Sequence, residues 1–163
     1  MNSDEIDYSS VAIHIPRAIQ ALYLPNVLHS ITLEEFRDCF RIHQMQGKAW
    51  LFQNISNVDK NSKVLVVGSW LGFTSYCLFK NGFSYIHETD LDIRLSSISL
   101  GINSDNPNFM HMCDDVNHVK IDDYDLIINT SCEHIENQSW FHKIKPGSTA
   151  VSYTHLTLPT IYS

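Results

Sequence analysis

The sequence predicts an α/β fold in which a mainly parallel sheet of about five strands follows an N-terminal helical segment. Three observations lead to this prediction. Short apolar runs alternate with helical patterns over residues 63–151, an order typical of parallel sheets. Val64–Val67 is a run of four branched apolar residues that ends at Gly68, as expected for a strand buried on both faces. The chain has 163 residues, 44% of them hydrophobic, which suffices for one buried core.

The N-terminal part is predicted to begin as a loose arm over residues 1–10 and to become helical further on. Thr32 and Glu35 have the spacing of a capping box, which marks the start of a helix. Apolar residues then recur at helical spacing, so we expect one helix over residues 33–55. Its aromatic stripe is interpreted as core rather than as a ligand site, and consists of Phe36, Phe40, Trp50 and Phe52.

After a polar loop, strands and helices are expected to alternate. Further strands are predicted at 83–89, 109–113, 124–129 and 149–151, and helices at 74–81, 94–102 and 138–144. We therefore divide the chain into a helical extension, a sheet domain and a tail, at residues 1–56, 57–151 and 152–163.

Composition excludes several classes of function. Eighteen acidic residues stand against eleven basic ones, for a net charge of −7, which disfavours nucleic acid because phosphate neutralisation needs clustered Lys and Arg. The acidic start does not resemble a signal peptide, and no apolar run could span a membrane. The cysteines are too widely spaced for a zinc ribbon or a compact disulfide framework, and we interpret them as buried reduced thiols of a cytoplasmic protein: Cys39, Cys77, Cys113 and Cys132.

The first candidate binding feature is the small-residue turn after the first strand. Gly68 allows a sharp turn, Gly72 allows a helix to pack closely on the sheet, and the N–H groups of the helix start favour an anion. A tight turn without a ligand would give the same pattern. The motif G-x-G-x-x-G of nicotinamide-binding proteins is absent from residues 68–73.

Acidic residues follow the next two strands. Asp90 ends the second strand, 22 residues after Gly68, where a carboxylate can accept both hydroxyls of a ribose. Glu88 points to the same side, but we prefer Asp90 because it lies at the strand end. Asp114 follows the third strand, where a carboxylate can accept an exocyclic amine of adenine. Each acid taken alone is equally well a solvated loop residue.

The ordered series of Gly68 with Gly72, then Asp90, then Asp114 resembles the class I S-adenosylmethionine-dependent methyltransferase family. The resemblance covers residues 58–151 and includes the turn over residues 145–148 before the fifth strand. It implies a Rossmann-like three-layer sandwich, S-adenosyl-L-methionine as the cofactor, and methyl transfer to an acceptor. The acidic charge favours a small-molecule acceptor over nucleic acid.

The same resemblance implies roles for the strand-end residues. The glycine turn would line the methionine part of the cofactor, the first acid would hold the ribose, and the residues after it would contact the adenine. Two departures stand out, because the family usually has an acid where this chain has Val66 and a glycine where it has Trp70. The implied cofactor contacts are Gly68, Ser69, Trp70, Gly72, Asp90, Leu91, Asp114 and Asp115.

The loop after the fourth strand is the candidate catalytic segment. Methyl transfer is an in-line displacement that depends on positioning, and a hydroxyl or amine acceptor benefits from a base such as His134. Glu133 would orient that base or bind a cationic substrate. Alternatively, both residues merely begin the next helix. Cys132 is disfavoured as a nucleophile because no neighbour would activate its thiol, and the histidine spacing predicts no metal site.

Two other functions stay open. Val66 and Trp70 motivate a non-catalytic Rossmann-like module that binds a nucleotide or cofactor, and a nicotinamide-dependent oxidoreductase is a weaker option. We also expect the natural protein to continue beyond about Val151, since only five of the family's seven strands can be assigned. Residues 152–163 look similar to translated adapter or vector sequence.

Overall fold

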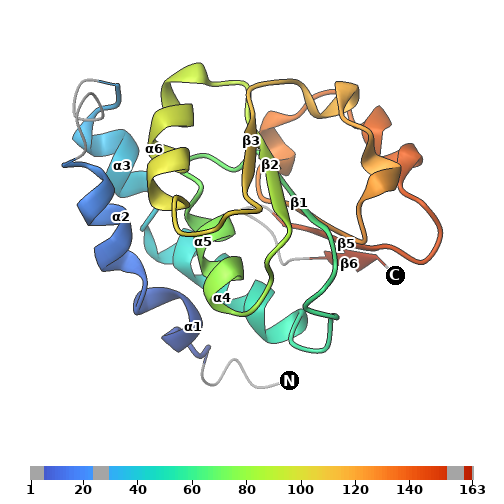
Figure 1. The fold of residues 1–163 in the computed structure, drawn as a ribbon, viewed down its shortest axis with the longest axis horizontal. Helices are drawn as coiled ribbons and strands as arrows, with labels where there is room; N and C mark the ends of the chain where they lie inside the picture. Colours follow the sequence, from blue (N-terminus) through green and yellow to red (C-terminus); the bar gives the residue numbers. More distant parts are fainter. Residues whose placement is uncertain (1–5, 24–29, 154–159, 163) are drawn as a thin grey trace.

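A six-stranded sheet forms the centre of the structure (Figure 1), a computed structural model that describes residues 6–23, 30–153 and 160–162. The strand order is β3-β2-β1-β4-β5-β6. The first five strands are parallel and β6 runs antiparallel to β5. The predicted Rossmann-like α/β fold with a mainly parallel sheet is confirmed. The strands are β1 (Val64–Val67), β2 (Ile86–Thr89), β3 (Met110–Met112), β4 (Leu126–Asn129), β5 (Thr149–Ser152) and β6 (Thr160–Tyr162).

The central strand β1 is buried along its whole length, as its four branched apolar residues predict. Val64 lies opposite Ile86 of β2 and Leu126 of β4. Because the neighbouring strands run in the same direction, their carboxyl ends meet at one edge of the sheet. The loops that carry the candidate site residues leave from that edge.

Within the described residues, six α-helices cover one face of the sheet (Figure 1). They share one apolar cluster with β1 side chains such as Val64 and Val66, and this cluster includes Ala18, Phe36 and Ile98. The N-terminal helices therefore pack on the same core as the sheet. The helices are α1 (Ser9–Ala12), α2 (Ile15–Ala21), α3 (Leu33–Asp38), α4 (Ile42–Asn54), α5 (Phe73–Lys80) and α6 (Ser96–Ile102).

Short 3₁₀ helices cover the opposite face and complete the three layers. Leu65 and Val67 of β1 point to this side and pack with Ile127 and the buried Trp140. The 3₁₀ segments that bury a residue on this side are Val116–His118, Ile121–Asp123 and Ser139–Lys143. Of the other two, Cys132–His134 lies in the loop after β4, and Ile93–Leu95 leads into α6 and buries Leu95 in the apolar cluster of the α-helical face. The predicted α-helix over 138–144 is thus corrected to a 3₁₀ helix. The first residues of the 3₁₀ helix Ser139–Lys143 are hydrogen-bonded to Asn117, whose Oδ1 accepts bonds from Ser139 Oγ and Trp140 N.

The single helix predicted over 33–55 is wrong, because the chain breaks between α3 and α4. The capping box is present: Glu35 N donates to Thr32 Oγ1 and Thr32 N donates to a Glu35 carboxylate oxygen. At Arg41 the backbone leaves the helical region, with ψ of 150°. The break places the Phe40 ring between Phe36 and Phe73, at centroid distances of 5.0 and 5.1 Å. Tertiary packing of one aromatic ring therefore overrides the helical periodicity.

Two other sequence predictions concern the ends of the chain. The loose arm predicted over residues 1–10 falls partly outside the described residues, and α1 already begins at Ser9. The division into segments 1–56, 57–151 and 152–163 stays a prediction. Within the last segment, residues 154–159 and 163 lie outside the described part, and Thr160–Tyr162 forms β6.

Candidate functional site

A cleft of about 460 Å³ lies at the carboxyl ends of β1, β2, β3 and β4. This is the edge at which open α/β sheets bind ligands. Of the ten residues predicted for the site, three do not line this cleft: Ser69 lines a smaller cavity beside it, Gly72 packs beneath helix α6, and Glu133 lines neither cavity. The seven that do line it are Gly68, Trp70, Asp90, Leu91, Asp114, Asp115 and His134.

The turn after β1 requires both of its glycines. Gly68 has φ of +64°, and a Cβ on it would lie 2.5 Å from Ser131 Oγ. Gly72 has φ of +76°, and a Cβ there would lie 2.9 Å from Asn103 Nδ2. The left-handed conformation and the close approach each exclude a side chain. The glycine at position 68 thus allows the loop after β4 to lie against the turn at the cleft. The glycine at position 72 allows the start of α5 to pack against α6.

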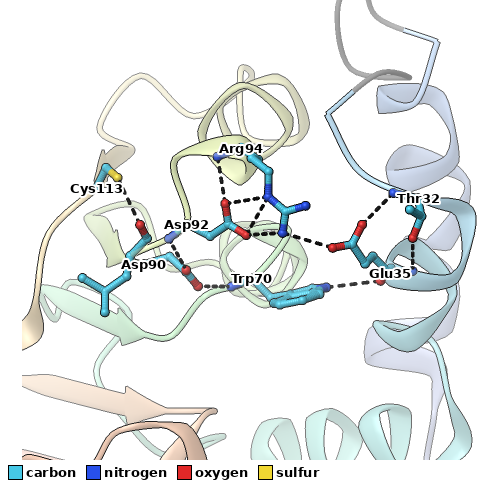
Figure 2. Close-up of polar contacts among 8 residues, drawn as sticks. Thr32, Glu35, Trp70, Asp90, Asp92, Arg94 and Cys113 are labelled. Atoms are coloured by element: carbon cyan, nitrogen blue, oxygen red, sulfur yellow. Dashed lines mark hydrogen bonds and ion pairs between the residues drawn. The ribbon is translucent and has the colours of Figure 1, made fainter.

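Trp70 occupies the left-handed region, with φ of 55°, where a glycine would be unstrained. Its backbone N–H donates to Asp90 Oδ2 at 2.9 Å, and its indole Nε1 donates to the Glu35 carbonyl at 3.4 Å. Figure 2 shows the ring extending from the turn toward α3. Trp70 lines both the cleft and the smaller cavity. Trp70 therefore forms a wall between them and connects the turn to the N-terminal helices.

Asp90 lies half-buried at the end of β2 and is held by two backbone donors. Trp70 N bonds to Oδ2 and Asp92 N bonds to Oδ1, at 2.9 and 3.0 Å (Figure 2). Burial raises the pKa of Asp90, and these two N–H bonds oppose the increase. A carboxylate has about four lone-pair positions, so two stay available to a ligand. The arrangement fixes a carboxylate at the cleft and leaves it able to accept further hydrogen bonds.

An ion-pair network links the loop after Asp90 to helix α3. Arg94 Nη2 lies 2.6 Å from an Asp92 carboxylate oxygen and 3.0 Å from Glu35 Oε1 (Figure 2). Hydrogen bonds from Arg94 are the largest cause that lowers the pKa of Asp92. Glu35 is also the capping-box residue of α3. The N-terminal helices are thus attached to the cleft both through Trp70 and through Arg94.

Glu88 does not reach the cleft, because helices α5 and α6 enclose it completely. Its carboxylate accepts hydrogen bonds from Ser75 Oγ at 2.5 Å and from Ser99 Oγ, and His111 Nδ1 lies 2.8 Å from Oε1. Glu88 is therefore a buried structural acid. Of the two acids of this strand, only Asp90 faces the cleft.

Asp114 and Asp115 also line the cleft, Asp114 exposed and Asp115 half-buried. The imidazole of His118 donates to Asp114 at 2.8 Å, which lowers the pKa of that carboxyl and raises the pKa of His118. Asp115 caps the next 3₁₀ helix through the Asn117 N–H, which lowers its pKa as well. Leu91 is 72% exposed, so its side chain presents an apolar surface beside these acids.

Of the predicted catalytic pair, His134 lines the cleft and Glu133 does not. His134 lines both cavities and its side chain is 71% exposed. Its Nε2 is 3.7 Å from Glu133 Oε1, which is too long for a hydrogen bond. Burial raises the pKa of the Cys132 thiol, which agrees with its low rank as a nucleophile. The prediction that all cysteines are buried holds for Cys39 and Cys77 and fails for the exposed Cys113 at the sheet edge.

Sequence reasoning missed the residues that α3 and α4 contribute. A second cavity of about 140 Å³ adjoins the cleft and shares Gly68, Trp70, Ser131 and His134 with it. Lys48 lines this cavity and is 96% buried, since its exposed fraction is 4%. The available signal was a lysine within a helix of otherwise apolar buried residues. Asp38, Cys39 and Gln44 also line the cavity from this side.

In the described part of the chain, no group of three His, Cys, Asp or Glu side chains could hold a metal ion. Among the same residues, no helix combines the length and the apolar character needed to cross a membrane.

No protein-family model and no curated protein matches the sequence. Solved structures do resemble it. A Methanococcus maripaludis protein, provisionally named an S-adenosyl-L-methionine-dependent methyltransferase, matches 94% of this chain with a TM-score of 0.56 and 14% identity. The chain spans 66% of that protein.

Two further structures match about two thirds of the chain. The phosphoethanolamine N-methyltransferase 2 of Haemonchus contortus, in complex with S-adenosyl-L-methionine, has a TM-score of 0.56 and 14% identity over 65% of this chain and 27% of its own. The glycopeptide N-methyltransferase MtfA, complexed with sinefungin, has a TM-score of 0.54 and 11% identity over 65% of this chain and 53% of its own. These likenesses establish the fold.

Proposed function

We propose that this chain, which has the fold of the S-adenosylmethionine-dependent methyltransferases, binds S-adenosyl-L-methionine and transfers its methyl group to a small-molecule acceptor. The observation that carries the proposal is the convergence of Gly68, Asp90, Leu91 and Asp114 on one cleft at the carboxyl edge of the sheet. Gly68 and Asp114 are 46 positions apart in the sequence, and in this proposal both contact the same bound cofactor.

The residues present fit this cofactor. Asp90 has lone pairs to accept two ribose hydroxyls, and the exposed Leu91 offers a surface for the flat adenine. Asp114, which lines the same cleft, would accept the adenine amine. Ser69 Oγ is buried without a hydrogen-bond partner in the adjoining cavity, as expected of a group that meets a ligand.

When bound, the cofactor supplies an electrophilic methyl group. The turn at Gly68 and the wall at Trp70 would fix the direction in which that group faces, and positioning is the main source of rate enhancement in such a displacement. His134, between the two cavities, would accept the proton of a hydroxyl or amine acceptor, and Glu133 would orient it. The net charge of −7 favours a small acceptor over nucleic acid.

Calorimetric titration with S-adenosylhomocysteine tests the proposal. The wild-type chain should bind, and Asp90→Ala should weaken binding by about tenfold or more, since two hydrogen bonds to a charged acceptor are lost. Asp123→Ala is the matched control, because Asp123 pairs with Lys120 outside the cleft. Absence of heat with the wild-type chain, or equal affinity of the Asp90 variant, contradicts the proposal.

A non-catalytic binding module is the second candidate. The exposure of His134 and its 3.7 Å distance from Glu133 favour it, because the pair is not arranged as a hydrogen-bonded acid and base. Incubation with methyl-labelled cofactor and a small-molecule extract separates the two functions. Label recovered in a product supports transfer, and binding without any labelled product supports the module.

A further inference from the structure

A buried hydrogen-bond network joins two of the strands whose ends form the cleft. Its centre is Glu88 of β2, which is fully buried and accepts bonds from Ser75 Oγ of α5 and Ser99 Oγ of α6. The third partner is His111 of β3, whose Nδ1 lies 2.8 Å from Glu88 Oε1. One carboxylate therefore connects two neighbouring strands to the two helices that cover them.

The imidazole of His111 is held at both of its ring nitrogens. Its side chain is 3% exposed, and Nε2 lies 2.9 Å from Ser96 Oγ at the start of α6. Because a carboxylate only accepts hydrogen bonds, Nδ1 is the donor toward Glu88, and in the neutral ring Nε2 accepts the Ser96 hydroxyl. The two bonds fix the orientation of the ring between β2 and α6.

Strand β3 depends on such an anchor because it is the outermost strand of the sheet. It is three residues long, and within the described residues it pairs with β2 alone. Met110 is 48% exposed, whereas His111 lies opposite Glu88 in the strand register. A strand with a neighbour on one side only is held largely by side-chain contacts to its partner strand and to the helix that covers it.

The end of β3 carries the acid that we assign to the adenine amine. Asp90 N donates to the Met112 carbonyl at 3.1 Å, and Thr89 Oγ1 donates to the Asp114 carbonyl at 2.5 Å. These bonds connect the ends of β2 and β3 at the cleft. His111 lies three residues before Asp114, so a shift of β3 at His111 would displace Asp114 relative to Asp90.

We propose that His111 is a positioning residue of the cofactor site, whose bond to Glu88 holds β3 so that Asp114 meets the adenine amine. The inference rests on the proposed function and deepens it, because it identifies a determinant of selectivity for adenine. His111 is not among the described residues that line the cleft. It acts through the strand that carries Asp114.

Two ligands that differ only at the adenine amine test this role. They are S-adenosylhomocysteine and its purine analogue, in which hydrogen replaces the amine, and the ratio of their calorimetric affinities is the preference for adenine. The wild-type chain should prefer adenine by about tenfold, as expected for one hydrogen bond to a charged acceptor. Asp114→Ala removes that acceptor and should abolish the preference.

The variants of His111 separate positioning from direct contact. His111→Leu should lower the preference for adenine by about threefold or more, because β3 loses its anchor while Asp114 is still present. His111→Asn should retain most of the preference, since its amide places a donor near the position of Nδ1.

His87→Leu is the matched control. His87 lies on the neighbouring strand β2, and its Nδ1 is 3.0 Å from Tyr124 Oη. Tyr124 belongs to the apolar cluster on the opposite face of the sheet. This variant also removes a hydrogen-bonded imidazole from the sheet, and it should leave the preference for adenine unchanged.

The unfolding midpoint of each variant, followed by circular dichroism, verifies that it is folded. If His111→Leu does not fold, Ser96→Ala decides, because it leaves Nε2 without its donor and keeps the bond to Glu88. It should lower the preference by about twofold, and an unchanged preference in that variant would overturn the proposal.

Equal weakening of both ligands by His111→Leu would overturn the positioning role, because a general structural effect acts on both ligands alike. An equal loss of preference in His87→Leu would overturn it as well. Failure of the wild-type chain to bind either ligand contradicts the proposed function itself. Binding of both ligands with equal affinity leaves the proposed function standing and overturns this inference alone.

Discussion

Gly72 provides a quantitative test of how the turn after β1 is built. A Cβ at this position would lie 2.8 Å from Ser99 Cβ and 2.9 Å from Asn103 Nδ2. Neither neighbour can move freely, because Ser99 Oγ bonds to Glu88 and Asn103 Nδ2 donates to the Gly72 and Ser99 carbonyls at 3.0 Å. Gly72→Ala therefore combines a backbone penalty with a steric one.

The backbone penalty for an alanine at φ of +76° is about 1–2 kcal/mol. Overpacking a buried contact costs about 1–3 kcal/mol more. We expect Gly72→Ala to lower the free energy of unfolding by about 2–5 kcal/mol, measured by urea denaturation followed by circular dichroism. The matched control is Gly147→Ala, where φ is +88° and nothing lies within 4 Å of the added Cβ. Equal losses in the two variants would refute the close packing of the turn against α6.

Two further predictions concern the acids at the strand ends. Glu88→Ala should lower the free energy of unfolding by about 3–5 kcal/mol in the same assay, because three buried polar partners lose their acceptor. Glu88→Gln is the comparison variant. If Glu88→Ala lowers the free energy of unfolding no more than Glu88→Gln does, the structural role of the Glu88 carboxylate is contradicted. Asp114→Asn should lower the pKa of His118, which the Asp114 hydrogen bond raises in the wild type, and an NMR titration of the imidazole measures the change. Since the folded-state pKa of His118 is raised, this pair stabilises the fold below the unfolded pKa of histidine and the contribution is lost as pH rises through the folded value. An unchanged imidazole titration in Asp114→Asn would exclude the hydrogen bond.

The sheet could be predicted from sequence because its central strands are buried on both faces. Val64–Val67 is a short apolar run and Leu126–Asn129 begins with one, both typical of a covered strand, and both strands occur where expected. The order of strand-end residues then placed Gly68, Asp90 and Asp114 along one edge, since parallel strands end on the same side. These predictions depended on local pattern and on a general rule of topology.

The features that could not be predicted from the sequence depend on contacts between segments that are distant in the chain. The break at Arg41 follows from the packing of Phe40 between two rings, which periodicity within one helix cannot show. The role of Trp70 as a wall follows from its bond to Glu35, 35 residues away. Lys48 was overlooked because a lysine within a helical pattern is usually solvated, whereas here the helix face that carries it is covered.

The position of S-adenosylhomocysteine in a crystal structure of this chain, grown with the compound at saturating concentration, is the most direct test of the cleft. We predict that the ribose hydroxyls bond to Asp90, that the adenine lies on Leu91, and that its amine reaches Asp114. The compound bound at another surface, or an Asp90 carboxylate without ligand contacts at saturation, would contradict the proposed cofactor site.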